Sequence, residues 1–314
     1  MIDRIHPELR PLLPTLPQVD ITDPVAFRER QRIRAAELAA NVVRPPDLTV
    51  VDRLVPGPAG APEVPVRIYT PGGSFSALGA LVWFHGGGYV FGEIEASERS
   101  CVEIASTVGC VVVSVEYRLA PEHPYPAGLD DCFAALTWVS EHADELGVDS
   151  ERLAIGGVSA GAGLAAALAL RVRDEQGPRL VYQLLDNPML DDRLETASIN
   201  EFTDTPLWSH SQAVLGWDFY LGDRSADTPP HAAAARADDV SGLPPAWIAA
   251  NELDPLRDEA IEYALRLMRA GVSVELHHRP GTFHGSNAFP GVSVSDRTRE
   301  DMHLGLKRAL TKTA

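Results

Sequence analysis

Residues 152–166 read RLAIGGVSAGAGLAA, a stretch whose apolar start predicts a buried strand and whose Ala- and Leu-rich end predicts a helix. Ser159 stands between the two in the pentapeptide GVSAG. A turn that joins a strand so directly to a helix has no room for large side chains, and Gly157 and Gly161 supply the two small neighbours. The serine oxygen then lies at the helix N-terminus, where backbone N–H groups face a developing anion. The stretch therefore predicts a strand–turn–helix unit with Ser159 as a candidate nucleophile.

The same residues allow two other interpretations. Residues 161–166, GAGLAA, match the G-x-G-x-x-A pattern of dinucleotide-binding turns, and Asp186 lies 25 residues beyond Gly161 at the end of the next expected strand. In such a fingerprint the first glycine occupies the turn directly after the strand, whereas Gly161 already falls inside the helix. That position favours the serine turn over a dinucleotide site. A purely structural glycine-rich turn is the third interpretation.

A glycine-rich loop occurs earlier in the chain. Residues 85–88, HGGG, directly follow a short apolar run that predicts another buried strand. Consecutive glycines let backbone N–H groups approach a substrate oxygen without interference from side chains. Gly86 and Gly87, together with the N–H of Ala160 after the serine, are therefore the candidate oxyanion hole. We expect His85 to brace this loop rather than to transfer protons.

The candidate acid and base follow late strands. A serine hydroxyl is a poor nucleophile near neutral pH and needs a base within hydrogen-bond reach, which a carboxylate orients. Asp254 comes just after an expected strand, with Pro255 suited to the first position of a helix, and Glu252 is the alternative acid. His284 is the candidate base, in the glycine-flanked loop GTFHG at residues 281–285. The order serine, acid, histidine is the one that a nucleophile turn of this kind requires.

Composition excludes several classes of protein. The chain has 314 residues, with 27 basic and 44 acidic side chains, so its formal net charge is −17. This charge disfavours binding to nucleic acids and to anionic membranes. No G-x-x-x-x-G-K pattern occurs, which excludes a P-loop nucleotide site. We expect neither a cofactor nor a metal ion.

The cysteines and the N-terminus bear on the compartment. Cys101, Cys110 and Cys132 form an odd set without a C-x-x-C pair, so we expect buried thiols rather than disulfides or a zinc site. The first residues lack the basic and apolar regions of a signal peptide, and the longest apolar stretch, 160–170, is too short to span a bilayer. These features predict a cytoplasmic protein without integral membrane segments.

Alternation of strand and helix patterns along the chain predicts a mainly parallel sheet with helices on its faces. The expected strands cover residues 49–55, 64–69, 80–84, 111–115, 152–155, 180–185, 246–250 and 272–277. The expected helices cover about 24–41, 95–107, 130–146, 160–174, 258–270 and the tail from 295. The last strand, which ends at the His277–His278 pair, should lie near a sheet edge, where it could pair across a homodimer. Neither histidine needs a catalytic role.

One segment, residues 189–241, interrupts this alternation. It contains no clear strand pattern and is rich in aromatic side chains. An insertion of this kind after a late strand predicts a lid over the carboxyl edge of the sheet, and a packed helical excursion without a ligand role is the alternative. Phe202, Trp208 and Tyr220 are the candidates for lining a substrate pocket.

A resemblance to a known family joins these features. Residues 117–127, YRLAPEHPYPA, are its strongest single match, followed by residues 85–92 and 254–259. With the serine turn, they make the chain similar to the hormone-sensitive lipase-like (bacterial family IV) esterases of the α/β-hydrolase fold. The match runs from about residue 80 to the C-terminus. In physical terms the 117–127 stretch is structural, and we expect Arg118 and Glu122 to form a buried pair that holds it.

The resemblance implies an eight-stranded, mostly parallel sheet flanked by helices, with a helical cap. It implies a catalytic core of residues 46–188 and 242–314 and a cap of residues 1–45 and 189–241. It also implies a serine carboxylesterase that hydrolyses small, uncharged esters of short-to-medium acyl chains through an acyl-enzyme. Val158 departs from the family, which usually has Asp or Thr there, so some hydrogen-bond support of the turn is missing or moved.

Two other functions remain open on the same scaffold. A non-catalytic ligand-binding protein is possible because fold does not determine function, although such proteins typically lose the base, and His284 is present. An amidase or carbamate hydrolase would use the same three residues. The sequence does not indicate which acyl groups the protein accepts.

Overall fold

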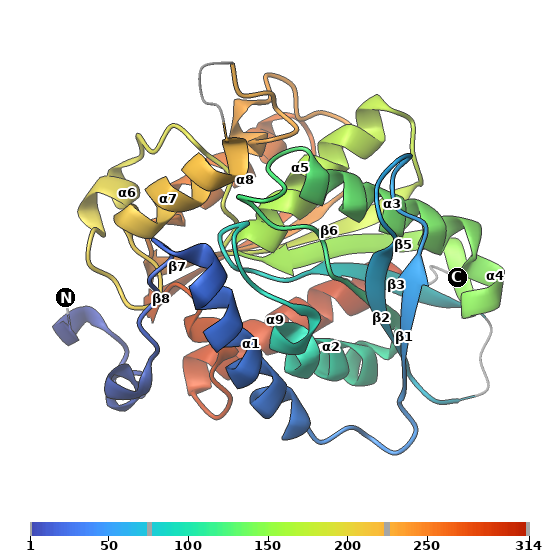
Figure 1. Ribbon diagram of the computed structural model, residues 1–314, viewed down its shortest axis with the longest axis horizontal. Coiled ribbons are helices and arrows are strands. Elements are labelled where there is room, and N and C mark those ends of the chain that lie inside the picture. Colours follow the sequence, from blue (N-terminus) through green and yellow to red (C-terminus); the bar gives the residue numbers. More distant parts are fainter. Residues whose placement is uncertain (1, 74–76, 223–226, 312–314) are drawn as a thin grey trace.

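The computed structural model describes residues 2–73, 77–222 and 227–311. Within these residues eight strands form one sheet in the order β1-β2-β4-β3-β5-β6-β7-β8 (Figure 1). From β4 onward neighbouring strands run parallel, whereas β2 pairs antiparallel with both β1 and β4. The predicted eight-stranded, mostly parallel sheet is confirmed. The strands are β1 (Thr49–Val55), β2 (Val64–Thr70), β3 (Leu78–Phe84), β4 (Val111–Val115), β5 (Val148–Val158), β6 (Leu180–Asp186), β7 (Ala246–Leu253) and β8 (Val274–Phe283).

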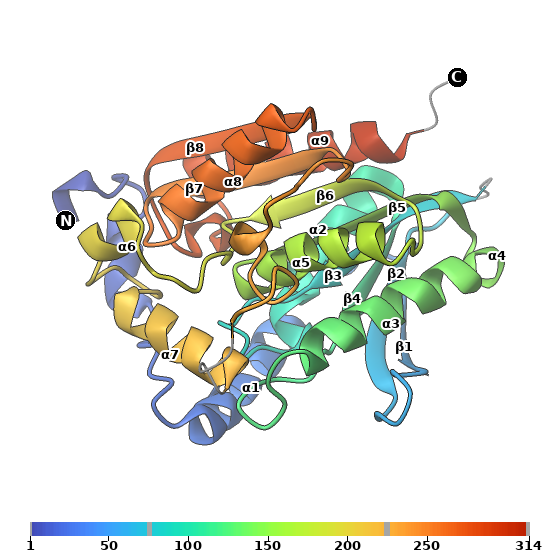
Figure 2. The same ribbon diagram turned by 90° about the horizontal axis from the view of Figure 1, so that it is seen from above.

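Helices cover both faces of the sheet. Figure 2, seen from above, shows α3, α5 and α8 lying across the near face. Helices α2 and α9 pack on the opposite face (Figure 1). The helices of the described chain are α1 (Pro24–Ala40), α2 (Glu98–Ile104), α3 (Ala127–Glu141), α4 (Ala143–Leu146), α5 (Ala160–Asp174), α6 (Ala197–Glu201), α7 (His210–Leu221), α8 (Arg257–Arg269) and α9 (Ser293–Leu310). None of them is long and apolar enough to cross a membrane.

The central strands are apolar throughout because both of their faces are covered. Every residue of β4, VVVSV, is buried. Val113 belongs to the large core under α3 and α5, and its neighbour Val112 belongs to the smaller core under α2 and α9. Successive side chains of a strand point to opposite faces, so a strand that is buried on both sides reads as a continuous apolar run. The same reason accounts for the apolar run in β3.

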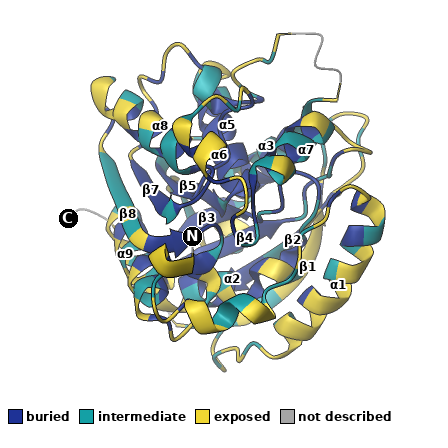
Figure 3. Cartoon of the chain, turned by 90° about the vertical axis from the view of Figure 1, so that its left-hand side faces the viewer, coloured by how far each residue is buried: buried dark blue, intermediate teal, exposed yellow. Residues whose placement is uncertain are grey.

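The N-terminal segment lies beside the insertion between β6 and β7. Helix α1 begins after Asp23, whose carboxylate accepts a hydrogen bond from the N–H of Ala26, as the Asp-Pro pair predicts. The amide of Gln212 in α7 donates to the carbonyl of Val19 at 2.5 Å, and Arg4 pairs with Glu201 of α6. Figure 3 shows the outer side of α1 exposed to solvent.

The structure corrects three expectations. Arg118 pairs not with Glu122 but with the buried carboxylate of Asp131 in α3, at 2.8 Å. Glu122 is largely exposed and pairs with Arg28. The wrong prediction arose because sequence proximity was taken for contact, whereas α3 brings Asp131 back under the loop.

The other two corrections concern element ends. Strand β8 continues to Phe283, so His277 and His278 lie inside it, because its ladder with β7 extends past them. Helix α8 starts at Arg257, and Pro255 lies in the preceding turn. The predicted edge position of this last strand is confirmed, since β8 ends the strand order.

Candidate active site

Ser159 occupies the sharp turn between β5 and α5. Its backbone has φ 57° and ψ −121°, a conformation that costs a residue with a side chain about 1–3 kcal/mol. The turn is held by its neighbours in the sheet, because the N–H of Ser159 donates to the carbonyl of Asp186 at 2.8 Å. Its carbonyl accepts from the N–H of Gly163 at 2.9 Å and of Met189 at 3.2 Å. The surrounding structure thus over-determines a strained turn, as nucleophile turns require.

The small residues around Ser159 are required by close backbone contacts. A Cβ atom at Gly157 would lie 2.5 Å from the carbonyl oxygen of Phe84, and one at Gly161 would lie 2.1 Å from that same oxygen. A Cβ at Gly163 would lie 2.2 Å from the carbonyl oxygen of Met189. These contacts bring the end of β3 against the serine turn. The glycines of the pentapeptide are therefore fixed by the crossing of β3 and α5.

Three side chains from distant parts of the sequence meet at this turn. The Ser159 Oγ lies 2.9 Å from the Nε2 of His284, and the Nδ1 of His284 lies 2.8 Å from the Oδ2 of Asp254. In the tautomer that satisfies both contacts, Nδ1–H donates to the carboxylate and the serine hydroxyl donates to Nε2. All three residues are buried, with Asp254 only 1% exposed. The imidazole is thus oriented to accept the serine proton.

Asp254 rather than Glu252 is the carboxylate that reaches His284. Glu252 accepts a hydrogen bond from the N–H of Gly281 at 2.7 Å and pairs with Arg4. The Gly281 N–H lowers the pKa of Glu252 below its ordinary value. Asp254 also accepts the N–H of Leu256 at 2.9 Å, which fixes its second carboxylate oxygen. The two candidate acids therefore have different roles: Asp254 binds His284, whereas Glu252 joins the N-terminal segment to β8.

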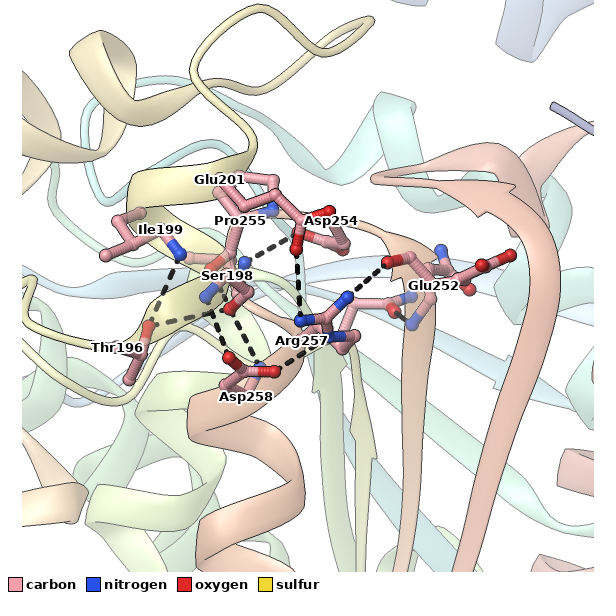
Figure 4. Close-up of polar contacts among 12 residues, drawn as sticks. Thr196, Ser198, Ile199, Glu201, Glu252, Asp254, Pro255, Arg257 and Asp258 are labelled. Atoms are coloured by element: carbon pink, nitrogen blue, oxygen red, sulfur yellow. Dashed lines mark hydrogen bonds and ion pairs between the residues drawn. The ribbon is translucent and has the colours of Figure 1, made fainter. Parts of the chain in front are cut away.

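The turn that carries Asp254 is bound to the insertion, as Figure 4 shows. The hydroxyl of Ser198 in α6 donates to the carbonyl of Pro255 at 2.9 Å and accepts the N–H of Asp258 at 3.0 Å. The Asp258 carboxylate in turn accepts the N–H of Ser198 at 2.7 Å. The first turn of α8 and the start of α6 therefore satisfy each other's free backbone groups. This contact fixes the insertion next to the acid.

The glycine loop lies against the serine. A Cβ at Gly86 would lie 3.4 Å from the Ser159 Cβ and 3.3 Å from a methyl of Val158. Gly87 has φ 128°, and a Cβ there would lie 1.8 Å from the carbonyl oxygen of Phe91. The N–H of Ala160 is the first of α5 and has no acceptor within the helix. Val158 thus packs on the loop with its methyl groups, where the family usually has a polar side chain.

His85 braces the loop from below. Its ring stacks on Tyr117 with centroids 4.2 Å apart, and the Tyr117 hydroxyl donates to the His85 carbonyl at 2.8 Å. The Nδ1 of His85 lies 2.8 Å from the Gly86 carbonyl. Complete burial lowers the pKa of His85 to about 4, so the ring is neutral at pH 7 and donates from Nδ1. Tyr117, the first residue of the eleven-residue signature, therefore supports the glycine loop directly.

The three aromatic candidates of the insertion lie in different places. The Trp208 ring lies 6.0 Å from the His284 ring, and a Cβ at Gly88 would lie 2.3 Å from its outer edge. Tyr220 instead stacks on Tyr89 at 4.0 Å. Phe202 is buried under Arg4 and Arg257 in a separate cluster. Of the three, the structure brings Trp208 to the base and the glycine loop.

A cavity of about 730 Å³ lies between the N-terminal segment and the insertion. Leu207 lines this cavity and also touches the position of Gly285, since a Cβ there would lie 3.2 Å from it. The cavity thus borders the residue next to His284. No sequence pattern pointed to Leu207, which has a backbone φ of 65°. The lining is mixed: apolar side chains such as Ile5, Leu13 and Leu207 alternate with polar or charged ones, Gln18, Asp20, Asp204, Thr205 and Gln212.

Comparison with known proteins agrees with this geometry. A family model described as alpha/beta hydrolase fold matches residues 81–287. The chain belongs to this family. It is 40% identical to carboxylesterase NlhH of Mycobacterium tuberculosis over 98% of this chain and 96% of that one. It is 39% identical to esterase LipI of the same species, over 91% of this chain and 90% of that one. The resemblance to the hormone-sensitive lipase-like esterases is confirmed.

Solved structures give the same result. The structure of a bacterial heroin esterase superposes on this protein with a TM-score of 0.96. The two chains are 44% identical, and the match covers 99% of each. The likeness thus includes the N-terminal segment and the insertion as well as the sheet. Within the described residues of this α/β-hydrolase-fold protein, no group of three or more His, Cys, Asp or Glu side chains could hold a metal ion.

Proposed function

We propose that this protein is a serine carboxylesterase with Ser159 as nucleophile, His284 as base and Asp254 as acid. The observation that carries the proposal is the unbroken chain of hydrogen bonds from the Ser159 hydroxyl through His284 to Asp254. The glycine loop beside it supports the same reaction. The relatives named carboxylesterase and esterase, alike over almost the whole chain, add to this support.

The reaction follows from the placement of these groups. Ser159 Oγ attacks the ester carbonyl carbon while His284 Nε2 takes the hydroxyl proton, and the imidazolium is stabilised by Asp254. The carbonyl oxygen becomes an oxyanion that accepts hydrogen bonds from the N–H groups of Gly86, Gly87 and Ala160. One such donor is worth about 2.7–4 kcal/mol in the transition state.

Collapse of this intermediate breaks the bond to the alkoxy oxygen. The imidazolium returns its proton to that oxygen, and the alcohol leaves. A water molecule then attacks the acyl carbon while His284 takes one of its protons. The acyl–Oγ bond breaks, the imidazolium returns that proton to Ser159 Oγ, and the carboxylic acid leaves. No further reactant is needed.

The substrates we propose are small, uncharged esters with short-to-medium acyl chains. Support comes from the cavity beside Leu207, whose two charged lining residues, Asp20 and Asp204, are both acidic, and from the net charge of −17; both disfavour anionic substrates. Trp208, close to both His284 and the glycine loop, is the wall residue that we expect to touch the substrate. Rates on a series of chromogenic esters of increasing acyl length, with a matched amide and carbamate, test this proposal. Faster cleavage of the amide or the carbamate would favour the alternative hydrolase.

Residues 1–45 and 189–241 form the cap in this proposal, over a core of residues 46–188 and 242–314. The hydrogen bond between Gln212 and Val19 supports it by joining the two cap segments. The cytoplasmic location and the homodimer through the edge strand stay predictions, to be checked by cell fractionation and by light scattering.

Substitution of the nucleophile tests the function. Ser159→Ala should lower kcat by about 10⁶ and abolish covalent labelling by an organophosphate. Ser114→Ala, which changes a buried serine of β4, is the matched control and should leave turnover near that of the unmodified protein. Full turnover in the Ser159→Ala variant would refute the assignment, and absence of labelling in the unmodified protein would favour a non-catalytic ligand-binding role.

A further inference from the structure

A buried carboxylate that the triad does not use lies behind it. Asp186 is the last residue of β6, beside Val158 of β5 and Ala249 of β7. Its carbonyl accepts the N–H of Ser159 at 2.8 Å, so its backbone holds the nucleophile turn. In a dinucleotide site a carboxylate at this strand end would bind a ribose, but here its side chain points to other groups.

The Asp186 side chain is held by two amides. One carboxylate oxygen accepts from the Nδ2 of Asn187 at 2.7 Å and from the Nδ2 of Asn287 at 2.8 Å. Asn287 belongs to the short 3-10 helix Ser286–Ala288, which starts two residues after His284. Its carbonyl accepts a hydrogen bond from Arg299 of α9 at 2.6 Å. Asp186 is therefore linked to the chain directly after the base.

A second series of hydrogen bonds links Asn187 to the residue directly before His284. The side-chain oxygen of Asn187 accepts the N–H of Asn251 at 3.0 Å, and the Nδ2 of Asn251 donates to the carbonyl of Phe283 at 2.8 Å. Phe283 precedes His284. One buried hydrogen-bond network thus joins the carboxyl ends of β6, β7 and β8. It contacts the chain both before His284, at Phe283, and after it, at Asn287. Such a network restricts the orientation of the groups it joins.

The charge of Asp186 also acts on the site. Three charged or titratable groups interact with it: His284, Asp254 and Arg299. Burial raises the pKa of Asp186 to about 6, while the hydrogen bond from Asn287 lowers it. The carboxylate is therefore ionised at neutral pH and attracts a positive charge on the imidazole. Interaction between two such groups is reciprocal, so each favours the charged form of the other.

We propose that Asp186 is a positioning residue of the esterase site, which holds the His284 loop through Asn287 and favours the imidazolium with its charge. This role rests on the proposed function, because the imidazolium forms when His284 takes the serine proton. A carboxylate at this place stabilises that charge in addition to Asp254, with which the ring makes its direct hydrogen bond. Removing the charge should therefore affect the chemical step more than substrate binding.

Asp186→Asn separates the charge from the hydrogen bonds. The asparagine oxygen still accepts from both Asn187 and Asn287, while the negative charge is lost. The matched control is Glu116→Gln, which neutralises a half-buried carboxylate with a raised pKa directly after β4. Two measurements are made on each protein: the imidazole pKa of His284 by NMR without substrate, and kcat and KM for a short-chain ester from pH 5 to 9.

In Asp186→Asn the imidazolium loses a nearby negative charge, so the NMR titration of His284 and the acid limb of kcat/KM should both move to lower pH. The plateau value of kcat should fall roughly 3–10-fold with KM unchanged. Glu116→Gln should match the unmodified protein in both measurements. An unchanged His284 pKa and acid limb in a folded Asp186→Asn variant would overturn the electrostatic role.

A second variant covers the case in which Asp186→Asn does not fold. Asn287→Ala removes the link to the His284 loop and keeps the carboxylate, so kcat should fall several-fold, and an unchanged kcat would overturn the positioning role. The NMR titration needs no substrate. If the unmodified protein hydrolyses no ester, the proposed function fails, while the His284 pKa still decides whether Asp186 acts on the imidazole.

Discussion

At the residue scale, the His284 ring makes its direct hydrogen bond to the carboxylate of Asp254. Asp254→Asn would place an amide opposite Nδ1 and favour the wrong tautomer, so kcat should fall by about 10⁴ while the fold is kept. Glu252→Gln is the control, since Glu252 faces Gly281 and Arg4 instead of the imidazole. Steady-state kinetics on a short-chain ester distinguish the two carboxylates. A larger loss in Glu252→Gln than in Asp254→Asn would assign the acid to Glu252.

Also at the residue scale, the serine turn has no room for one added methyl group. Gly157→Ala would place a Cβ 2.5 Å from both the Phe84 carbonyl oxygen and the Gly161 backbone. The clash is with backbone atoms, so we expect a loss of about 3 kcal/mol or more in the free energy of unfolding and loss of activity. Gly177→Ala is the control, because its Cβ would make only ordinary van der Waals contacts, with Phe133 at 3.4 Å and with the Val172 Cα at 3.6 Å. Chemical denaturation measures both, and equal stability of the two variants would contradict the steric explanation.

At the element scale, an ion pair joins the loop after β4 to helix α3. Arg118 makes two side-chain hydrogen bonds of 2.8 Å to the buried carboxylate of Asp131, which also accepts the Arg118 N–H. Asp131→Asn leaves a half-buried arginine without its charge partner and should lower the free energy of unfolding by about 2–3 kcal/mol. Glu122→Gln breaks an exposed pair with Arg28 and should cost less than about 1 kcal/mol.

Denaturation curves for these two variants distinguish the observed Arg118–Asp131 pair from the Arg118–Glu122 pair that the sequence suggested. If Glu122→Gln were the more destabilising change, the loop would depend on Glu122 instead. Since Arg118 follows Tyr117, which supports the His85 carbonyl, the Asp131→Asn variant should also show lower activity at moderate temperature. The loop after β4 therefore stabilises the glycine loop, through the hydrogen bond from Tyr117 to the His85 carbonyl.

At the scale of the whole molecule, one half-buried acid makes stability depend on pH. Burial raises the pKa of Glu116 from 4.5 to about 7, and the Ile94 N–H only partly offsets this shift. Between these two pH values the folded protein keeps a proton that the unfolded chain has released. The free energy of unfolding therefore falls as pH rises from 4.5 to 7, by up to about 3 kcal/mol, and the loss stays constant above pH 7.

Glu116→Gln should remove this contribution. Its stability relative to the unmodified protein should rise between pH 4.5 and 7, because glutamine does not ionise and still accepts the Ile94 N–H. Urea denaturation at pH 5, 6, 7 and 8 measures the difference. An identical pH dependence in the two proteins would show that Glu116 does not titrate with the folded state.

Local patterns in the sequence were sufficient to predict the eight-stranded sheet and to select the candidate triad that the structure brings together. Strand periods, the Asp-Pro start of α1 and the glycines around Ser159 each reflect a constraint within a few residues, such as pleating, capping or a tight turn. The glycine loop, Asp254 and His284 follow strand ends, and parallel strands bring those ends to one edge. The placement of these side chains therefore follows from the order of elements alone.

Contacts between distant segments were decided only by the tertiary structure. Arg118 finds Asp131 because α3 folds back beneath it, and β8 extends past His277 because β7 continues to pair with it. Asp186 and Asn287 are about a hundred positions apart and meet only because β6 and the loop after β8 end at the same edge. Such pairs leave no periodic signal in a single sequence, since the free energy of each depends on the packing of all the elements between them.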